Sequence, residues 1–334
     1  MTAAVSSHSC APGMLNGEPT AGQVTMNSLP QPRSAAAAGV VTAAVILQNR
    51  RGMERKAFGR TGVAASVIGQ GTWHMGESPR EREREVAALS LGLDLGLTHI
   101  DTAEMYGNGG AEEVVADTIR GRRRADLFLV SKVLPQNASY RGTIRAAEQS
   151  LRRLRTDYLD LYLLHWPGKY PIADTMGAME SLVAAGKIHF VGVSNFDVND
   201  LGAAIAVLKR ERLACNQVLY NLATRSIERD LIPWCRQQGI AVVGYTPLDG
   251  FPRPGSEGLK LLTEIGTRYG KTPRQVALRF LTRAEIAFTI PKASNPEHVR
   301  ENAGACGFAL TQEDVAAIDA AFPAPRGPLP LAMG

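Results

Sequence analysis

Lys132 ends the run LFLVSK (127–132), in which Ser131 is the only other polar residue. Such a run predicts a buried strand, where an isolated ammonium costs several kcal/mol or loses its proton. Either Lys132 has a charged partner or it takes part in chemistry. Asp101, near the end of the preceding β-rich run THIDTA (98–103), can act as its counter-ion.

Other residues that could take part in binding or catalysis lie at or near the ends of β-rich runs. In chain order, with Gln217 inside its run, the set is Trp73, Asp101, Lys132, His165, Asn195, Gln217, Tyr245 and Lys292. Tyr106, in the loop EMYGNGG after Asp101, is a further candidate. Four of the candidates have a plain structural alternative: an ion pair for Asp101 and Lys132, a core position for His165, and a half-buried aromatic for Tyr106. Because they occur together on consecutive units, the spacing favours one shared site.

The elements that carry these residues recur along the chain. Eight β-rich runs lie at 67–73, 98–103, 127–132, 159–166, 189–195, 215–221, 241–248 and 287–293, and segments with helical spacing, such as 83–96, 143–154, 174–186 and 229–239, separate them. Near-continuous apolar strands that alternate with amphipathic helices predict a parallel (β/α)8 TIM barrel, whose active site lies at the carboxyl ends of its strands. An open doubly wound sheet would require G-x-G-x-x-G after the first strand, and neither GQGTWHMG nor GNGGAE has that spacing.

Outside the alternating strands and helices, the sequence contains a hairpin, an amino-terminal extension and a carboxyl-terminal tail. Residues 56–69 predict a β-hairpin around Arg60, Thr61 and Gly62 that can plug the bottom of the barrel. We expect residues 1–52 to be a disordered extension or to precede a true start at Met53, with a targeting role for the apolar stretch 34–47 as the alternative. The barrel is expected over 53–322 and an irregular tail over 323–334.

Composition excludes several classes of function. Of 334 residues, 45% are hydrophobic, and no run approaches the roughly 18 apolar residues of a spanning helix. The net charge of +5 is dispersed except at Arg120, Arg122, Arg123 and Arg124, which fit a solvated helix end better than a phosphate or nucleic-acid site. The four cysteines are far apart, so we expect a reducing cytoplasm and no metal site. A monomer is expected, and oligomers stay open.

Asp101, Tyr106, Lys132 and His165, set in DTAEMYG, VSK and LYLLHWP, resemble the catalytic tetrad of the aldo-keto reductase family. The resemblance covers about 56–322, and VGVSNF, NQVLYN, GYTPL and IPKASNPEHVRENAG follow in that family's order. GQGTWHMGE, DTAEMYGNGGAE and FPAPRG are most similar to bacterial members that reduce methylglyoxal and other small aldehydes. The resemblance implies reduction of a carbonyl group by a nicotinamide cofactor.

The chemistry of such a site can be reasoned from the side chains. A carbonyl that accepts a hydride develops negative charge on oxygen, so a proton donor must lie within hydrogen-bond reach. A lysine ammonium roughly 4 Å away stabilises a phenolate by about 4 kcal/mol at an effective dielectric constant of about 20, which lowers a tyrosine pKa by up to about 3. Tyr106 is therefore the expected general acid, Lys132 lowers its pKa, and Asp101 orients Lys132. His165 either orients the substrate carbonyl or assists proton relay.

By the same resemblance, Tyr245 stacks on the nicotinamide, Ser194, Asn195 and Gln217 hold its carboxamide, and Lys292 meets an adenosine 2′-phosphate. The full set of expected cofactor contacts is Thr72, Asp101, Ser194, Asn195, Gln217, Tyr245, Thr246, Pro247, Leu248, Lys292, Ser294, His298, Glu301 and Asn302. His298 stands where many members have arginine, and Ala293 where serine is common. Histidine is only partly charged near neutral pH, so we expect NADPH as cofactor with NADH possible.

Short loops after His165 and Leu248 predict an open, shallow pocket for a small aldehyde or ketoaldehyde. Trp73 and Trp166, with Tyr106 and His165, are the expected substrate contacts, and rim packing is the alternative for the two tryptophans. Two other functions remain open: a cofactor-binding sensor with little turnover, and a Schiff-base lyase with Lys132 as nucleophile.

Overall fold

The computed structural model describes residues 47–48, 53–327 and 329–333. The predictions for the extension 1–52 therefore lie outside the described residues, apart from Leu47 and Gln48. These two residues form the short strand β1 (Leu47–Gln48).

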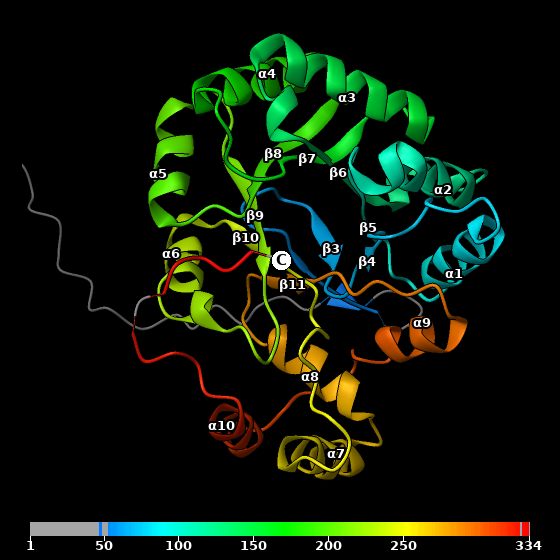
Figure 1. Ribbon diagram of the computed structural model, residues 1–334, viewed down its shortest axis with the longest axis vertical. Coiled ribbons are helices and arrows are strands. Elements are labelled where there is room, and N and C mark those ends of the chain that lie inside the picture. Colours follow the sequence, from blue (N-terminus) through cyan, green and yellow to red (C-terminus); the bar gives the residue numbers. More distant parts are fainter. Residues whose placement is uncertain (1–46, 49–52, 328, 334) are drawn as a thin grey trace, which may run out of the picture. The chain divides into compact units, whose positions relative to one another are not determined.

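Eight parallel strands form the centre of the fold (Figure 1). In chain order they are β4 (Gln70–Gly71), β5 (His99–Asp101), β6 (Phe128–Val133), β7 (Leu159–Leu164), β8 (Ile188–Ser194), β9 (Leu213–Leu219), β10 (Ala241–Tyr245) and β11 (Ala287–Thr289). Each strand pairs with the next along the chain, and two parallel bridges, Ile68 to Thr289 and Gly71 to Lys292, join the first segment to the last. The predicted (β/α)8 barrel is confirmed.

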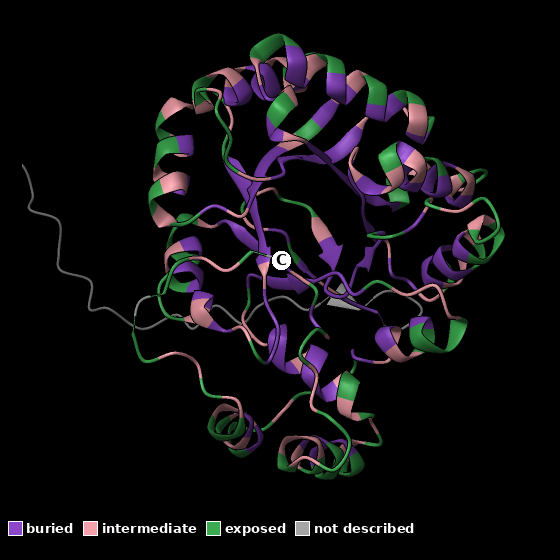
Figure 2. Cartoon of the chain, viewed as in Figure 1, coloured by how far each residue is buried: buried purple, intermediate pink, exposed green. Residues whose placement is uncertain are grey.

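Helices surround the strands and turn their apolar sides inward, as the burial colours of Figure 2 show. They are α1 (Arg82–Asp94), α2 (Gly110–Ile119), α3 (Tyr140–Leu154), α4 (Ile172–Ala184), α5 (Val198–Val207), α6 (Leu231–Gln238), α7 (Glu257–Tyr269), α8 (Pro273–Leu281), α9 (Pro296–Ala303) and α10 (Gln312–Ala321). Six of them have a side-chain oxygen that caps the amino end, supplied by Ser139, Asp197, Ser256, Thr272, Asn295 and Thr311. Among the described residues, no helix combines the length and apolarity needed to cross a bilayer.

The predicted hairpin closes the amino-terminal end of the barrel. Strands β2 (Glu54–Ala57) and β3 (Ala64–Ser66) pair antiparallel, and β1 adds to the outer side of β2. Phe58 in their turn is fully buried, with its ring centroid 4.7 Å from that of Phe128 and 5.0 Å from that of Phe288. Because Phe128 opens β6, this packing fills the barrel below the mouth and leaves the carboxyl ends of the strands free.

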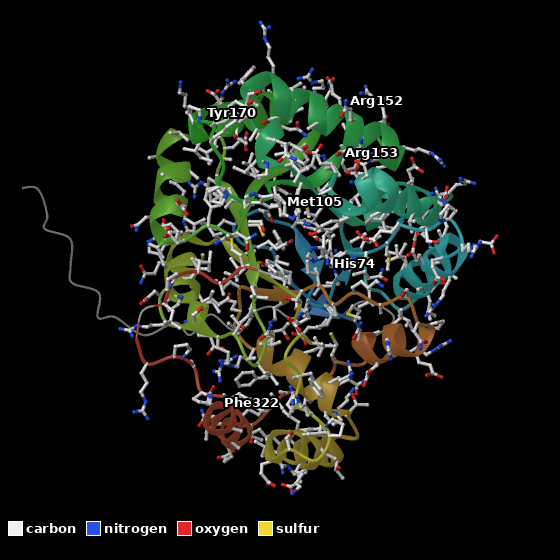
Figure 3. All side chains as sticks on the ribbon, in the orientation of Figure 1. His74, Met105, Arg152, Arg153, Tyr170 and Phe322 are labelled. Atoms are coloured by element: carbon white, nitrogen blue, oxygen red, sulfur yellow. The ribbon has the colours of Figure 1, made fainter. Side chains whose placement is uncertain are left out.

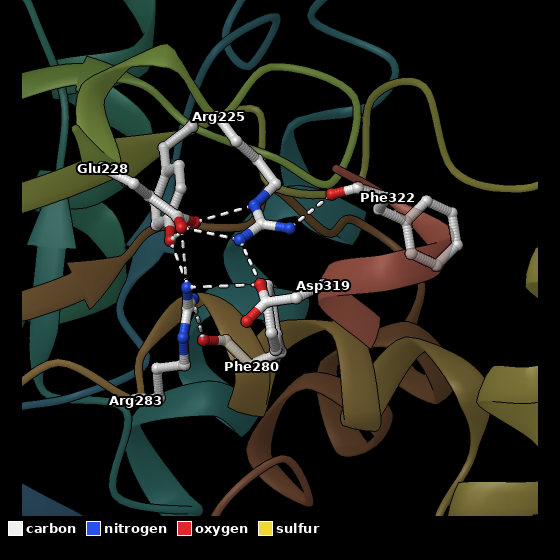
Figure 4. A network of polar contacts seen from close by, with 7 residues as sticks. Arg225, Glu228, Phe280, Arg283, Asp319 and Phe322 are labelled. Carbon is white, nitrogen blue, oxygen red and sulfur yellow. Dashed lines mark hydrogen bonds and ion pairs between the residues drawn. The ribbon is translucent and has the colours of Figure 1, made fainter. Parts of the chain in front are cut away.

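A buried arginine attaches the carboxyl-terminal helix to the barrel (Figure 4). Arg225 precedes the short turn η4 (Ser226–Glu228), and it donates Nε to Glu228 at 2.8 Å. It also donates to Asp319 in α10 and to the carbonyl of Phe322. Arg283, just after α8, donates to the same Glu228 at 2.7 Å. Three chain segments thus share one charge network, and residues 323–327 and 329–333 beyond it contain no helix or strand.

Candidate active site

The ammonium of Lys132 is fully buried and fully hydrogen-bonded. Its Nζ donates to Asp101 Oδ1 at 2.5 Å, to the carbonyl of Thr102 at 2.9 Å and to the hydroxyl of Tyr106 at 3.1 Å. An ammonium has three donors, so none is left over. Burial alone would lower the pKa of Lys132, but Asp101 and then Tyr106 outweigh it and raise that pKa above its usual value. Lys132 is therefore a permanent cation that is paired with Asp101 and also bonds to the hydroxyl of Tyr106.

Neighbouring strands place this pair. Asp101 is the last residue of β5. In the parallel pairing of β5 with β6 it lies opposite Val130, which precedes Lys132 by two positions. Two further hydrogen bonds hold Asp101 in place. Thr72 donates its hydroxyl to the backbone carbonyl of Asp101 at 3.0 Å, and Gln217 donates Nε2 to the carboxylate oxygen Oδ2 of Asp101 at 2.7 Å. Both carboxylate oxygens thus accept a hydrogen bond, which holds the charge in one orientation.

Tyr106 is positioned by a glycine-dependent contact between two loops. It opens the turn η1 (Tyr106–Gly109), where Gly107 has φ 54°. Gly76, with φ 72°, touches the backbone of Gly110 so closely that a Cβ on Gly76 would lie 2.1 Å from the carbonyl carbon of Gly110. No side chain fits there, so the loop after β4 packs directly on the loop that carries Tyr106. Trp73 from the first loop then lies edge-on to Tyr106, with ring centroids 4.9 Å apart.

The acidity expected for Tyr106 needs a correction. Burial raises the pKa of Tyr106, and although Lys132 acts to lower it, the net pKa lies above the ordinary value. The prediction that Lys132 lowers this pKa by up to about 3 was wrong in its net direction, because sequence reasoning did not count the desolvation of a nearly buried phenol. Tyr106 is therefore held in its protonated form, with the hydroxyl oxygen already accepting a bond from Lys132.

His165 lies directly after β7 and faces Tyr106, with ring centroids 5.7 Å apart. Burial, helped by the nearby charge of Lys132, lowers the pKa of His165 to about 2. The imidazole is therefore neutral at any working pH. A neutral ring can donate one hydrogen bond to a carbonyl oxygen, which favours the orienting role over a relay through an imidazolium.

A cavity of 220 Å³ opens above these residues at the carboxyl ends of the strands. Most of the residues that the sequence singled out line it: Thr72, Trp73, Asp101, Tyr106, His165, Trp166, Ser194, Asn195, Gln217, Tyr245, Thr246 and Lys292. Gly71, Met105 and Ile290 complete the lining, and sequence reasoning missed them. Figure 3 shows Met105 near the centre of the ring of helices. Its place beside Tyr106 in the same loop was the available signal.

Asn195 and Tyr245 form the side of the cavity away from Asp101. Tyr245 donates its hydroxyl to Asn195 Oδ1 at 2.9 Å, and Asn195 donates Nδ2 to the carbonyl of His165 at 3.1 Å. Asn195 adopts φ 61°, a conformation that costs free energy for a residue other than glycine and often marks functional sites. These bonds connect the ends of β7, β8 and β10 around one opening.

The remaining predicted cofactor residues lie outside the cavity lining: Pro247, Leu248, Ser294, His298, Glu301 and Asn302. Lys292 connects the two regions, since its Nζ donates to Ser294 Oγ at 3.1 Å. Glu301 faces the neighbouring helix instead, where Thr272 donates to it at 2.7 Å. His298 is exposed on α9.

A second permanent cation that sequence reasoning missed reaches the same loop. Arg84, in the first turn of α1, donates Nε to the carbonyl of Ser294 at 3.1 Å and pairs with Glu81 at 3.0 Å. In the printed sequence Arg84 belongs to the alternating charges EREREV, which look like a solvated helix face. Nothing in that pattern marks it. In the part of the chain that the structure describes, no cluster of three or more His, Cys, Asp or Glu could hold a metal ion.

Comparisons with known proteins agree with this geometry. Residues 67–322 match the model of the Aldo/keto reductase family. The chain is 46% identical over 273 residues to methylglyoxal reductase YeaE of Escherichia coli strain K12, a match that covers 81% of this chain and 96% of that protein. It is 36% identical over 261 residues to the glyoxal reductase of Bacillus subtilis strain 168, covering 78% and 90% of the two chains.

A solved structure also places this chain among the aldo/keto reductases. The crystal structure of an aldo/keto reductase from Klebsiella pneumoniae in complex with NADP and acetate has a TM-score of 0.76 and 46% identity, and the match covers 81% of this chain and 96% of that one. The family model spans the barrel from its first strand to α10. Of the four side chains that carried the resemblance, Asp101, Tyr106 and His165 line one cavity, and Lys132 bonds to Tyr106 behind that lining. This chain belongs to the aldo/keto reductase family.

Proposed function

We propose that this protein reduces small aldehydes and ketoaldehydes, such as methylglyoxal, to alcohols with NADPH as the hydride donor. The observation that carries the proposal is the bond from Lys132 Nζ to the hydroxyl of Tyr106 at the wall of the cavity. That bond leaves the phenol proton free to point at a substrate oxygen. The names of the two bacterial relatives, a methylglyoxal reductase and a glyoxal reductase, support the class of substrate.

The residues divide the work between orientation and proton transfer. A neutral His165 donates to the carbonyl oxygen and sets its angle. Tyr106 gives its proton to the same oxygen as negative charge develops there, and Lys132 stabilises the phenolate that remains. Asp101 keeps Lys132 protonated and in place. When bound, the reduced nicotinamide supplies the hydride, which no side chain can provide.

The cavity fits a small substrate beside a flat cofactor ring. Tyr245 offers an aromatic ring for stacking, Ser194, Asn195 and Gln217 offer amide and hydroxyl groups, and Lys292 offers a cation. The volume of 220 Å³ is below the roughly 300–1,000 Å³ of pockets for drug-sized ligands. Trp73 and Trp166 are the proposed apolar walls. A cytoplasmic, monomeric enzyme remains our prediction.

Arg84 is a proposed second contact for the 2′-phosphate, and this contact favours NADPH although His298 stands where many family members have arginine. Arg84 and Lys292 both bond to Ser294, so two permanent cations meet where the 2′-phosphate is expected. We expect Arg84→Gln to weaken NADPH binding about threefold to tenfold and to leave NADH binding unchanged, because only NADPH carries that phosphate. Quenching of protein fluorescence measures both dissociation constants. The control is Arg80→Gln, and equal weakening of both cofactors would contradict the role.

The dependence of reduction on pH follows from two pKa values. Reduction requires protonated Tyr106, whose pKa is raised, so activity is present at neutral pH and falls only as the pH rises through that pKa. His165, with a pKa of about 2, contributes no step. We expect kcat/KM to stay level from about pH 6 to about pH 9. An inflection near the ordinary histidine pKa that disappears in His165→Asn would show that the imidazole titrates during catalysis.

The other two functions lack a supporting observation in the site. A Schiff base would need an uncharged amine, whereas all three donors of Lys132 are engaged and its pKa is raised. A sensor would keep cofactor binding without turnover. The experiment that separates these cases uses NADPH carrying deuterium at both C4 positions and nuclear magnetic resonance of the product. Deuterium on the new carbinol carbon supports the proposal, and unlabelled or absent product contradicts it.

A further inference from the structure

A second cavity lies at the opposite end of the barrel from the active site. It has a volume of 300 Å³ and is formed by the carboxyl end of α2 and by the segments that lead from α2 to β6 and from α3 to β7. Its lining is Ala116, Ile119, Arg120, Gly121, Arg122, Arg124, Leu127, Arg155 and Thr156. Four of these residues are arginines and none is acidic. The sequence interpretation of this cluster as a helix end did not include Arg155, which comes from a different helix.

One arginine of the four builds the wall of the cavity. Arg124 donates Nε to Thr156 at 3.1 Å and a terminal nitrogen to the carbonyl of Tyr158 at 2.9 Å, and it pairs with Asp160 at 2.7 Å. Its guanidinium also lies 4.0 Å from the ring centroid of Tyr158. Arg124 thereby holds the segment after α3 against the segment before β6, which gives the cavity a fixed shape.

The positive charges of Arg120 and Arg155 are only partly neutralised by nearby carboxylates. Arg120 and Arg155 donate to the same oxygen, Asp117 Oδ1, at 2.7 Å and 3.0 Å. The other oxygen of Asp117 already accepts from Arg82 at 2.7 Å. The bond from Arg82, with Arg120 and Arg155 beside it, holds the pKa of Asp117 below its usual value. Three guanidiniums thus share one carboxylate, although Arg82 also reaches Glu113 at 3.2 Å.

The donors of these two arginines are mostly unused. Within the described ranges of the chain, Nε and one terminal nitrogen of Arg120 and of Arg155 have no hydrogen-bond partner. Arg122 is more committed, since it pairs with Asp94 at 3.0 Å and donates to the carbonyl of Ser90 at 3.3 Å. Arg120 and Arg155 therefore bring spare, permanently charged donors from two helices to one cavity.

We propose that this cavity binds a multiply charged oxyanion of the phosphate class, held by Arg120 and Arg155. Guanidinium groups match phosphate oxygens in pairs, and a dianion would supply the charge that Asp117 alone does not. Ile119, Leu127 and Ala116 give part of the wall an apolar character, which suits the organic portion of a small phosphorylated molecule. The site is independent of the proposed catalytic function.

The test is calorimetric titration of the full chain with pyrophosphate and, separately, with inorganic phosphate, in the presence of saturating NADPH. The reductase cavity is then occupied, so its cations are not available to the anion. The Arg120→Gln/Arg155→Gln variant is expected to weaken pyrophosphate binding at least about tenfold, because it removes two charge-assisted contacts. Both side chains are more than half exposed, so the variant keeps its fold.

The matched control is Arg123→Gln/Arg152→Gln, which removes the same charge from the same two segments. Both residues are exposed and lie outside the cavity lining, and Figure 3 labels Arg152 on α3. Affinity close to that of the unmodified protein in this control supports a specific site. Equal weakening in both variants would mean diffuse attraction to a basic surface and would overturn the proposal, as would the absence of binding. If Lys292→Gln alone abolished binding, the anion would belong to the cofactor site, which also overturns it.

Discussion

Replacing Tyr106 with phenylalanine is expected to lower kcat for reduction of methylglyoxal about 10²- to 10⁴-fold while NADPH still binds. The substitution removes one hydroxyl and keeps the ring that packs against Trp73 and His165. Lys132 keeps its bonds to Asp101 and to the carbonyl of Thr102, so the buried charge stays paired. The loss therefore reports the missing proton donor.

The measurement combines steady-state turnover with the dissociation constant of NADPH. Tyr140→Phe is the control, because Tyr140 is an exposed tyrosine whose hydroxyl bonds to Ser181, away from the cavity. The control should match the unmodified protein. Turnover of Tyr106→Phe within tenfold of the unmodified protein would remove Tyr106 from its assigned role.

Replacing Lys132 with methionine is expected to damage both catalysis and folding. The variant leaves Asp101 as a buried carboxylate without its cation, a change that typically costs about 3–5 kcal/mol in the free energy of unfolding. It also removes the charge that stabilises the phenolate of Tyr106, so reduction should fall by at least about a hundredfold. Urea unfolding and steady-state kinetics measure the two effects.

A second variant separates folding from chemistry. In Lys132→Met/Asp101→Asn the unpaired charge is gone and the amide can still accept from Gln217, so part of the lost stability should return. Activity should not return, because the cation is still absent. If both properties recover together, the effect of Lys132 on turnover is a consequence of folding. If Lys132→Met unfolds no more easily than the unmodified protein, the buried pair does not stabilise the fold as described.

The barrel could be predicted because its strands are buried on both sides. Parallel strands of this kind appear in sequence as apolar runs, and each of the eight runs overlaps an observed strand. The ends of the elements were less predictable, since they depend on hydrogen bonds to partners far along the chain. The run 67–73, for example, contains only the two-residue strand β4, while Ile68 takes part in a single bridge to Thr289.

The four side chains could be placed at one end of the barrel from their positions at or near strand ends, and the family resemblance supplied their roles, but the contacts that complete the site could not be predicted. The third acceptor of Lys132 is a backbone carbonyl, that of Thr102, and Asp101 is bonded by Gln217 from 116 positions away. Neither contact has a local pattern. The direction of the Tyr106 pKa depends on burial, which exists only after folding. Arg84 was missed because a charge on a helix surface looks the same whether or not a distant loop meets it.

Hydride transfer by this chain from NADPH to a small aldehyde can be followed directly through the absorbance of the reduced nicotinamide after rapid mixing. NADPH-loaded protein is mixed with methylglyoxal in a single turnover, beside the Tyr106→Phe variant. We expect complete loss of the reduced band with the unmodified protein and a rate at least about a hundredfold lower with the variant. A stable band with the unmodified protein, despite bound NADPH and an excess of methylglyoxal, would mean that this chain does not reduce methylglyoxal.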